Sequence, residues 1–137
     1  MDEPSQSAAR EGRSILVVED NAVNRKLARN VLRARGYTVY EATTGEEALD
    51  KLQEIQTDLV LMDIQLPGMD GLEVTRRLKS DPRTADLPVV ALTAHAHHEH
   101  EAVALQVGCV GYITKPIRLN HFPGQIAGYL DSDSGSV

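Results

Sequence analysis

Residues 58–71 read DLVLMDIQLPGMDG and carry the clearest structural signal in the chain. The apolar run at 59–62 has the length and composition of a buried strand, and it ends in the carboxylate of Asp63. A turn-forming segment rich in proline and glycine follows at once. The pattern therefore places one carboxylate at the tip of a strand.

Three other apolar runs also end in polar side chains: residues 15–18 precede Glu19 and Asp20, residues 89–92 precede Thr93, and residues 112–114 precede Lys115. Near-continuous apolar runs are typical of parallel strands that are buried on both faces. The carboxyl ends of parallel strands meet at one edge of the sheet, where open α/β folds bind ligands. We therefore predict a single site with Asp63 at its centre.

The rest of the chain alternates between strand and helix patterns. We predict strands at 14–18, 38–42, 58–63, 89–93 and 111–114, and helices at 23–34, 45–54, 71–79, 99–107 and from about 119. This order predicts one α/β domain over residues 14–130, with a five-stranded parallel sheet between two layers of helices. Residues 1–13 and 131–137 are mostly small and polar, and we expect them to be mobile tails.

The spacing of apolar residues predicts which faces of the first and last helices are buried. In the first helix the expected buried residues are Val23, Leu27, Val31 and Ala34. In the last helix they are Phe122, Ile126 and Leu130. The last helix also contains Pro123 and two glycines, and each glycine costs about 1 kcal/mol relative to alanine. We therefore expect this helix to be short, weak or frayed.

The composition excludes several classes of protein. Apolar residues make up 42% of the chain and charged residues 25%, which is ordinary for a soluble globular domain. The net charge of −6 argues against a domain that neutralises nucleic-acid phosphates. No apolar stretch approaches the ~18 residues of a membrane span, and residues 1–13 are polar and carry no apolar h-region. The single cysteine, Cys109, is expected to be a small buried residue in a cytoplasmic protein.

Five motifs together resemble the response-regulator receiver domain of two-component signalling. They are VVEDN at 17–21, LMD at 61–63, LPGMDG at 66–71, VALTA at 90–94 and YITKP at 112–116. The resemblance covers about residues 14–130 and is greatest to single-domain regulators of the DivK type. It implies the flavodoxin-like strand order 2-1-3-4-5.

The residue types fit the chemistry that this resemblance implies. Asp63 would attack a phosphoryl group, and the charge that gathers there needs a divalent cation such as Mg²⁺ or Mn²⁺. The resemblance implies that Asp20 and Asp63 bind the ion directly, that Glu19 acts through water, and that the Gln65 carbonyl completes the ligands. Lys115 and Thr93 would contact phosphoryl oxygens, and a cis peptide bond before Pro116 would direct Lys115 into the site.

Further residues acquire roles from the same resemblance. Thr93 and Tyr112 would form a switch that changes the face made by the last two helices and the fifth strand, although Tyr112 is also compatible with ordinary core packing. Gln65 and His95 would border the phosphoryl group and set its lifetime. Arg25, Arg29 and Arg33 form a row on the first helix, opposite its expected core face. This row is either a solvated face or a docking site for the phosphoryl donor.

Four histidines lie within six residues, at positions 95, 97, 98 and 100. If a helix begins near His97, then His97, His100 and Glu101 share one face and could bind a transition metal or respond to pH. The alternative is a solvated loop and first helical turn, which the absence of a complete zinc-binding pattern favours.

The leading hypothesis is a stand-alone regulator that accepts a phosphoryl group from a phosphohistidine and signals to a protein target. Such a protein would catalyse its own phosphorylation and dephosphorylation at Asp63 without being a turnover enzyme. Its partners would be a histidine kinase or a histidine phosphotransfer protein and a downstream target, and both a monomer and a weak dimer remain open. The alternatives are a phosphorelay intermediate, a phosphate sink, or a receiver excised from a hybrid kinase.

Overall fold

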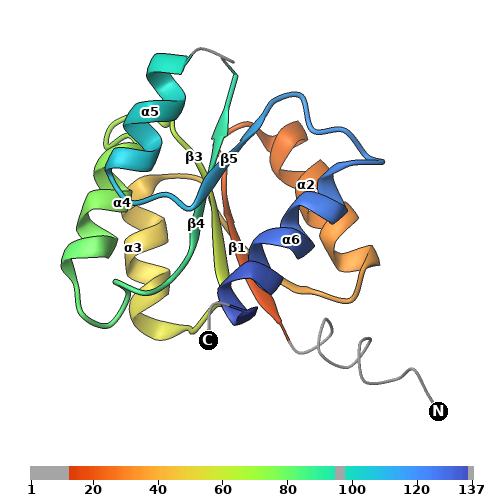
Figure 1. Cartoon of the computed structure of the whole chain (residues 1–137), viewed down its shortest axis with the longest axis horizontal. Coiled ribbons are helices and arrows are strands. Elements are labelled where there is room, and N and C mark those ends of the chain that lie inside the picture. The colour runs from red at the N-terminus through yellow and green to blue at the C-terminus, as the bar shows by residue number, and fades with distance from the viewer. Residues whose placement is uncertain (1–12, 95–97, 136–137) are drawn as a thin grey trace.

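The computed structural model describes residues 13–94 and 98–135, in which five strands alternate with five helices (Figure 1). The strands are β1 (Ser14–Val18), β2 (Thr38–Ala42), β3 (Leu59–Asp63), β4 (Val89–Thr93) and β5 (Gly111–Thr114). The helices are α2 (Ala22–Ala34), α3 (Gly45–Glu54), α4 (Gly71–Ser80), α5 (His98–Gln106) and α6 (Phe122–Gly135). Within these segments, no helix has the length and apolar character needed to cross a bilayer.

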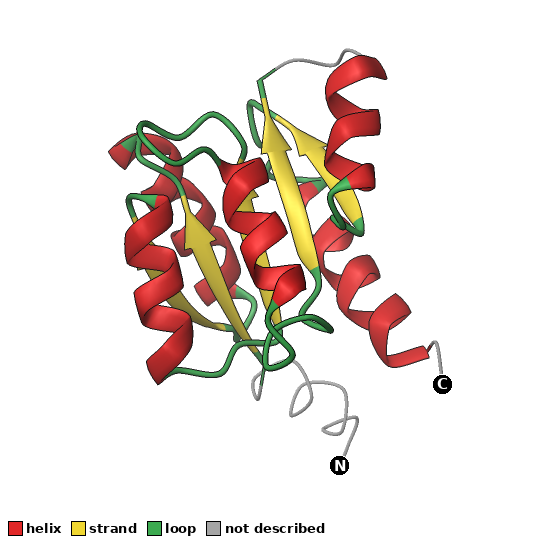
Figure 2. Ribbon diagram, turned by 90° about the vertical axis from the view of Figure 1, so that its left-hand side faces the viewer, coloured by secondary structure: helices red, strands yellow, loops and turns green. Residues whose placement is uncertain are grey.

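All strand pairs in the sheet are parallel, and the strand order is β2-β1-β3-β4-β5. The predicted fold class and strand order are therefore confirmed. Figure 2 shows the arrowheads at the same end of the sheet. The order reverses between β1 and β3, and this reversal marks the place where doubly wound sheets bind ligands. Asp63 and Thr93 end β3 and β4 at this carboxyl edge, and Glu19 and Lys115 directly follow β1 and β5 there.

The core has two halves, one on each face of the sheet. Helices α2 and α6 cover one face, and α3, α4 and α5 cover the other (Figure 1). Alternate residues of each central strand enter opposite halves, so Ile15 and Val17 face α2 and α6, while Leu16 and Val18 face the other layer. This two-sided burial explains why the central strands read as continuous apolar runs.

The buried face of helix α2 differs from the predicted one. Ala28 and Leu32 are fully buried, whereas Val23 is 75% exposed and Ala34 is exposed. The prediction was wrong for Val23 and Ala34 because apolar residues occupy two neighbouring stripes of this helix. The small Ala28 lies on the stripe that packs against the sheet, and Val31 lies partly buried at its margin.

Helix α6 is longer than the sequence predicted. It spans 14 residues and continues to Gly135, past residue 130, where we expected the domain to end. Phe122, Ile126 and Leu130 are buried as expected. Full burial of a large apolar side chain contributes about 1.5–3 kcal/mol, which outweighs the cost of two glycines. Pro123 lies in the first turn, where it removes no intrahelical hydrogen bond.

Candidate functional site

Three carboxylates meet at the carboxyl edge of the sheet. Val18 pairs with Met62 across β1 and β3, so the residues that follow, Glu19 and Asp63, lie side by side. Oxygens of Glu19, Asp20 and Asp63 all lie within 4.8 Å of one another. Glu19 and Asp63 are each 1% exposed, whereas Asp20 is open to solvent. The strand register thus concentrates negative charge at a single point.

Lys115 supplies the positive charge at this point. Its Nζ atom donates to Asp63 Oδ2 at 3.0 Å and to Glu19 Oε1 at 3.1 Å. The Lys115 backbone N–H donates to the Thr93 carbonyl at 2.7 Å, which fixes the start of the loop after β5. The Lys115–Pro116 peptide bond is cis, as predicted. One ammonium group therefore bridges the two buried carboxylates.

The close approach of these groups changes their acidity. Burial raises the pKa of Glu19 to about 7, the Asn21 backbone N–H at 3.1 Å opposes the rise, and the neighbouring Asp63 adds to it. Burial on its own would lower the pKa of Lys115, but hydrogen bonds and charge from Asp63 and Glu19 outweigh it and raise the pKa. Burial is thus the main cause of the raised pKa of Glu19, and the Asp63 carboxylate adds to it.

The donor set fits a hard divalent cation. Mg²⁺ prefers oxygen ligands and is usually held by one or two carboxylates together with water. Glu19 and Asp63 provide buried oxygens, and the exposed Asp20 leaves one side of the group open to water. The Gln65 backbone N–H donates to Asp63 Oδ1 at 2.9 Å and orients this carboxylate. The predicted role of the Gln65 carbonyl as a ligand stays a prediction.

Local sequence signals hold the loops on both sides of Asp63 in place. Asn21 caps α2 by accepting the Asn24 N–H at 2.9 Å, directly after the Glu19–Asp20 pair. Asp70 caps α4 in the same way. A side chain at position 71 would place its Cβ 2.2 Å from the Asp63 carbonyl oxygen, so only glycine fits there. The LPGMDG motif therefore packs the start of α4 against the backbone of Asp63.

Thr93 and Tyr112 occupy the neighbouring strands. Thr93 ends β4, is 1% exposed and pairs with Thr114, one position beyond the pair formed by Asp63 and Leu92. Tyr112 is partly buried against the core half that includes α5. The Glu101 carboxylate beside its hydroxyl raises the pKa of Tyr112. Thr93 lies on β4, which pairs with the strand of Asp63, and Tyr112 lies on β5, which pairs with β4. Their action as a switch stays a prediction.

The histidine cluster falls largely outside the described residues. His95 and His97 belong to the undescribed segment at 95–97, and α5 begins at His98. The proposed metal site on this cluster and the proposed lifetime role of His95 therefore stay predictions.

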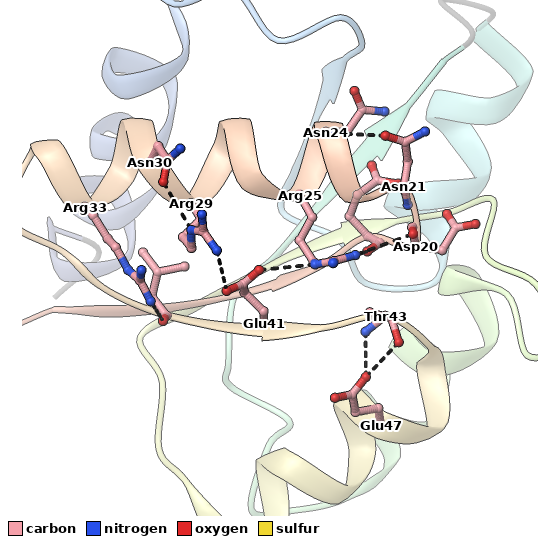
Figure 3. Close-up of polar contacts among 12 residues, drawn as sticks. Asp20, Asn21, Asn24, Arg25, Arg29, Asn30, Arg33, Glu41, Thr43 and Glu47 are labelled. Carbon is pink, nitrogen blue, oxygen red and sulfur yellow. Dashed lines mark hydrogen bonds and ion pairs between the residues drawn. The ribbon is translucent and has the colours of Figure 1, made fainter.

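The sequence predicted that the arginine row of α2 lies opposite the core face of the helix, but the structure places it beside β2. Arg25 Nε and Arg29 Nη1 form ion pairs with Glu41 of β2 at 3.2 and 3.3 Å, and Arg33 Nη2 donates to the Val39 carbonyl at 3.4 Å (Figure 3). The prediction was wrong because the buried stripe of α2 is centred on Ala28 and Leu32, which brings the row to the β2 side. The use of the row for partner docking stays a prediction.

Sequence reasoning missed Glu41. Its carboxylate binds two arginines, and its carbonyl accepts a hydrogen bond from Lys51 Nζ. The available signal was a single charged residue within the short strand TVYEA. That signal shows no partner, because the arginines lie 12 and 16 residues away on another element.

Comparison with known proteins agrees with this geometry. The model of the response regulator receiver domain family matches residues 15–127. The polar-differentiation response regulator DivK of Brucella ovis is 46% identical over 118 residues, which cover 86% of this chain and 96% of that protein. DivK of Brucella anthropi has the same identity and coverage.

Solved structures share the fold. The receiver domain of a sensor histidine kinase from Pseudomonas aeruginosa, with a magnesium ion coordinated in its active-site cleft, superposes with a TM-score of 0.80. It is 32% identical, and the match covers 88% of this chain and 98% of that one. The chemotaxis response regulator CheY4 of Vibrio cholerae gives a TM-score of 0.82 at 26% identity, covering 85% and 98% of the two chains. The chain therefore belongs to the response-regulator receiver family.

Proposed function

We propose that this chain is a single-domain response regulator that accepts a phosphoryl group on Asp63 from a phosphohistidine of a histidine kinase or a phosphotransfer protein. The observation that carries the proposal is the contact of Lys115 with Asp63 and Glu19, beside a third carboxylate on Asp20. The similarity to DivK extends over 96% of that protein, which supports a role like that of a DivK-type response regulator.

The transfer would be a simple displacement. A carboxylate oxygen of Asp63 forms a bond to phosphorus while the bond from phosphorus to the donor imidazole nitrogen breaks. The electron pair of that bond returns to the imidazole. Lys115 already contacts Asp63 Oδ2 and would neutralise a phosphoryl oxygen, and the Thr93 hydroxyl would donate to another. A cation held by Glu19, Asp20 and Asp63 would supply further positive charge and so reduce the repulsion between the Asp63 carboxylate and the phosphoryl group.

The signal would leave through α5, β5 and α6. Tyr112 contacts the α5 layer, and the Tyr129 hydroxyl of α6 donates to the Tyr112 carbonyl at 3.4 Å. Movement of Thr93 toward a phosphoryl group would free space for Tyr112 and favour a second arrangement of this face, which a target protein would recognise. Gln65 and His95 would then control access of water to the acyl phosphate.

The test is intact mass after exposure of the full chain to a small phosphodonor, with and without Mg²⁺. The wild type should gain one phosphoryl group only when Mg²⁺ is present. Asp63→Asn should gain none, because a neutral amide lacks the nucleophilic carboxylate oxygen. Asp58→Asn, directly before the opposite end of the same strand, is the matched control and should be modified like the wild type. Modification of Asp63→Asn at the wild-type level would refute the assignment.

A further inference from the structure

We propose that Arg25 is a positioning residue for the cation site. Its guanidinium, held by Glu41, fixes the backbone on both sides of Asp20 and thereby directs the Asp20 carboxylate. The inference rests on the proposed function in one respect, because it concerns the same Mg²⁺ site.

Arg25 reaches three acceptors with one side chain. Its Nη1 atom donates to the Glu19 carbonyl at 3.0 Å and to the Asp20 carbonyl at 3.4 Å, while Nε donates to Glu41 Oε1 at 3.2 Å (Figure 3). The two carbonyls belong to the peptide groups immediately before and after the Asp20 Cα atom. A single guanidinium therefore restrains the backbone on each side of this residue.

Asp20 needs such restraint more than the other two carboxylates do. Glu19 accepts from the Asn21 N–H and from Lys115, and Asp63 accepts from the Gln65 N–H and from Lys115. The Asp20 side chain is exposed at the solvent edge of the group. A metal ligand must be held close to its working geometry, and groups behind the ligand usually provide this support. For Asp20 the support acts through its backbone.

The anchor of Arg25 is itself well fixed. Glu41 is paired in register with Val17, and the next residue, Ala42, accepts the Glu19 N–H at 3.0 Å. The side chains of Arg25 and Glu41 are only 15% and 26% exposed, so water and salt screen their ion pair less than a surface pair. Strand β2 therefore holds the loop after β1 by a backbone bond and by the Arg25 bridge.

A positioning role and a purely electrostatic role of Arg25 predict opposite effects on Mg²⁺ affinity when the side chain is removed. The side chain carries a positive charge near a cation site, so its removal should tighten Mg²⁺ binding if charge is all that matters. If Arg25 positions Asp20, its removal should weaken binding. Loss of a group that supports a metal ligand typically costs 10- to 100-fold in affinity. The direction of the change thus separates the two effects.

The experiment measures Mg²⁺ affinity by calorimetry on the full chain, together with thermal unfolding in EDTA. Arg25→Ala should bind Mg²⁺ about tenfold more weakly than the wild type. Arg29→Ala is the matched control, because Arg29 also pairs with Glu41 but its side chain bonds to Glu41 and Asn30, not to the Asp20 loop. Its affinity should stay within about twofold, whereas both variants should lose similar thermal stability.

Arg25→Lys answers the same question if Arg25→Ala does not fold. A lysine keeps the charge but lacks the planar fork that reaches a carboxylate and two carbonyls together, so its affinity should also fall. Wild-type affinity in both Arg25→Ala and Arg25→Lys, tighter binding in Arg25→Ala, or an equal loss in Arg29→Ala would overturn the inference. Absence of Mg²⁺ binding by the wild type would instead refute the metal step of the proposed function.

Discussion

Lys115 balances the charges of the site. Its ammonium group lies between Asp63 and Glu19, and both carboxylates are almost completely buried. Buried charges are tolerated when they are paired, and removal of one partner leaves the other uncompensated. The residue thus stabilises the fold even when no phosphoryl group is bound.

Replacement of Lys115 by methionine should therefore destabilise the protein. In EDTA we expect the free energy of unfolding of Lys115→Met to fall by about 3 kcal/mol, because two buried carboxylates then face each other without a counter-charge. Urea denaturation followed by circular dichroism measures this change. Lys26→Met, at an exposed position of α2, is the control and should unfold like the wild type. Equal stability of Lys115→Met and the wild type would contradict the argument.

Individual site residues differ in how well the sequence predicts them. Asp63 and Lys115 each follow an apolar run, and that local pattern alone predicts their position at the sheet edge. Arg25 and Glu41 contact each other across two elements, and no local pattern indicates that contact. The charged residues at the sheet edge could be predicted, whereas the contact between Arg25 and Glu41 depends on how the elements pack.

At the scale of elements, helix α6 shows how packing overrides local propensity. Its glycines at 124 and 128 are exposed, and a Cβ atom at either position would meet no neighbour within 4 Å. Nothing in the described structure therefore requires glycine there. The helix forms because its other face is buried in the core.

The double substitution Gly124→Ala/Gly128→Ala should stabilise the protein. Each alanine should raise the free energy of unfolding by about 0.5–1 kcal/mol, because glycine loses more backbone entropy than alanine when the helix forms. Differential scanning calorimetry should show a higher Tm. Gly71→Ala should have the opposite effect and lower the free energy of unfolding by about 1–3 kcal/mol, because the alanine Cβ would meet the Asp63 carbonyl. A lower Tm for the double variant would show that α6 needs these glycines.

Helix α2 marks the limit of periodicity as a predictor. Apolar residues on two adjacent stripes allowed two rotations of the helix, and the sheet selected the stripe of Ala28 and Leu32. The same rotation placed the arginines beside β2. Choosing the wrong buried stripe of α2 thus also misplaced the arginine row.

At the scale of the whole molecule, the two-sided core protects its only cysteine. Cys109 is 5% exposed and belongs to the core half under α3, α4 and α5. Burial raises the pKa of its thiol more than the neighbouring Thr75 and Lys79 lower it. The layer architecture followed from apolar patterning, and the burial of Cys109 followed from the usual packing of a free cysteine as a small apolar residue. The strand order came from the family resemblance.

The thiol should make stability depend on pH in the alkaline range. The raised pKa keeps Cys109 protonated in the folded state, while the unfolded state releases this proton at lower pH. The stabilisation is thus complete below the thiol pKa of the unfolded chain and is lost as pH rises above it. Between pH 7.5 and 9.5 the free energy of unfolding of the wild type should therefore fall relative to that of Cys109→Ala, measured by urea denaturation. Parallel pH profiles for the two proteins would contradict this.

The packing of β5 restricts changes in chain length. A Cβ atom at Gly111 would lie 2.2 Å from the Tyr129 hydroxyl on α6, while the next residue, Tyr112, faces the opposite layer. An insertion or deletion of one residue that shifted β5 would exchange these two faces, and a deletion would place the ring of Tyr112 against Tyr129. Loops usually tolerate such changes, but here viable insertions and deletions before Gly111 are limited to those that the loop absorbs without shifting the strand.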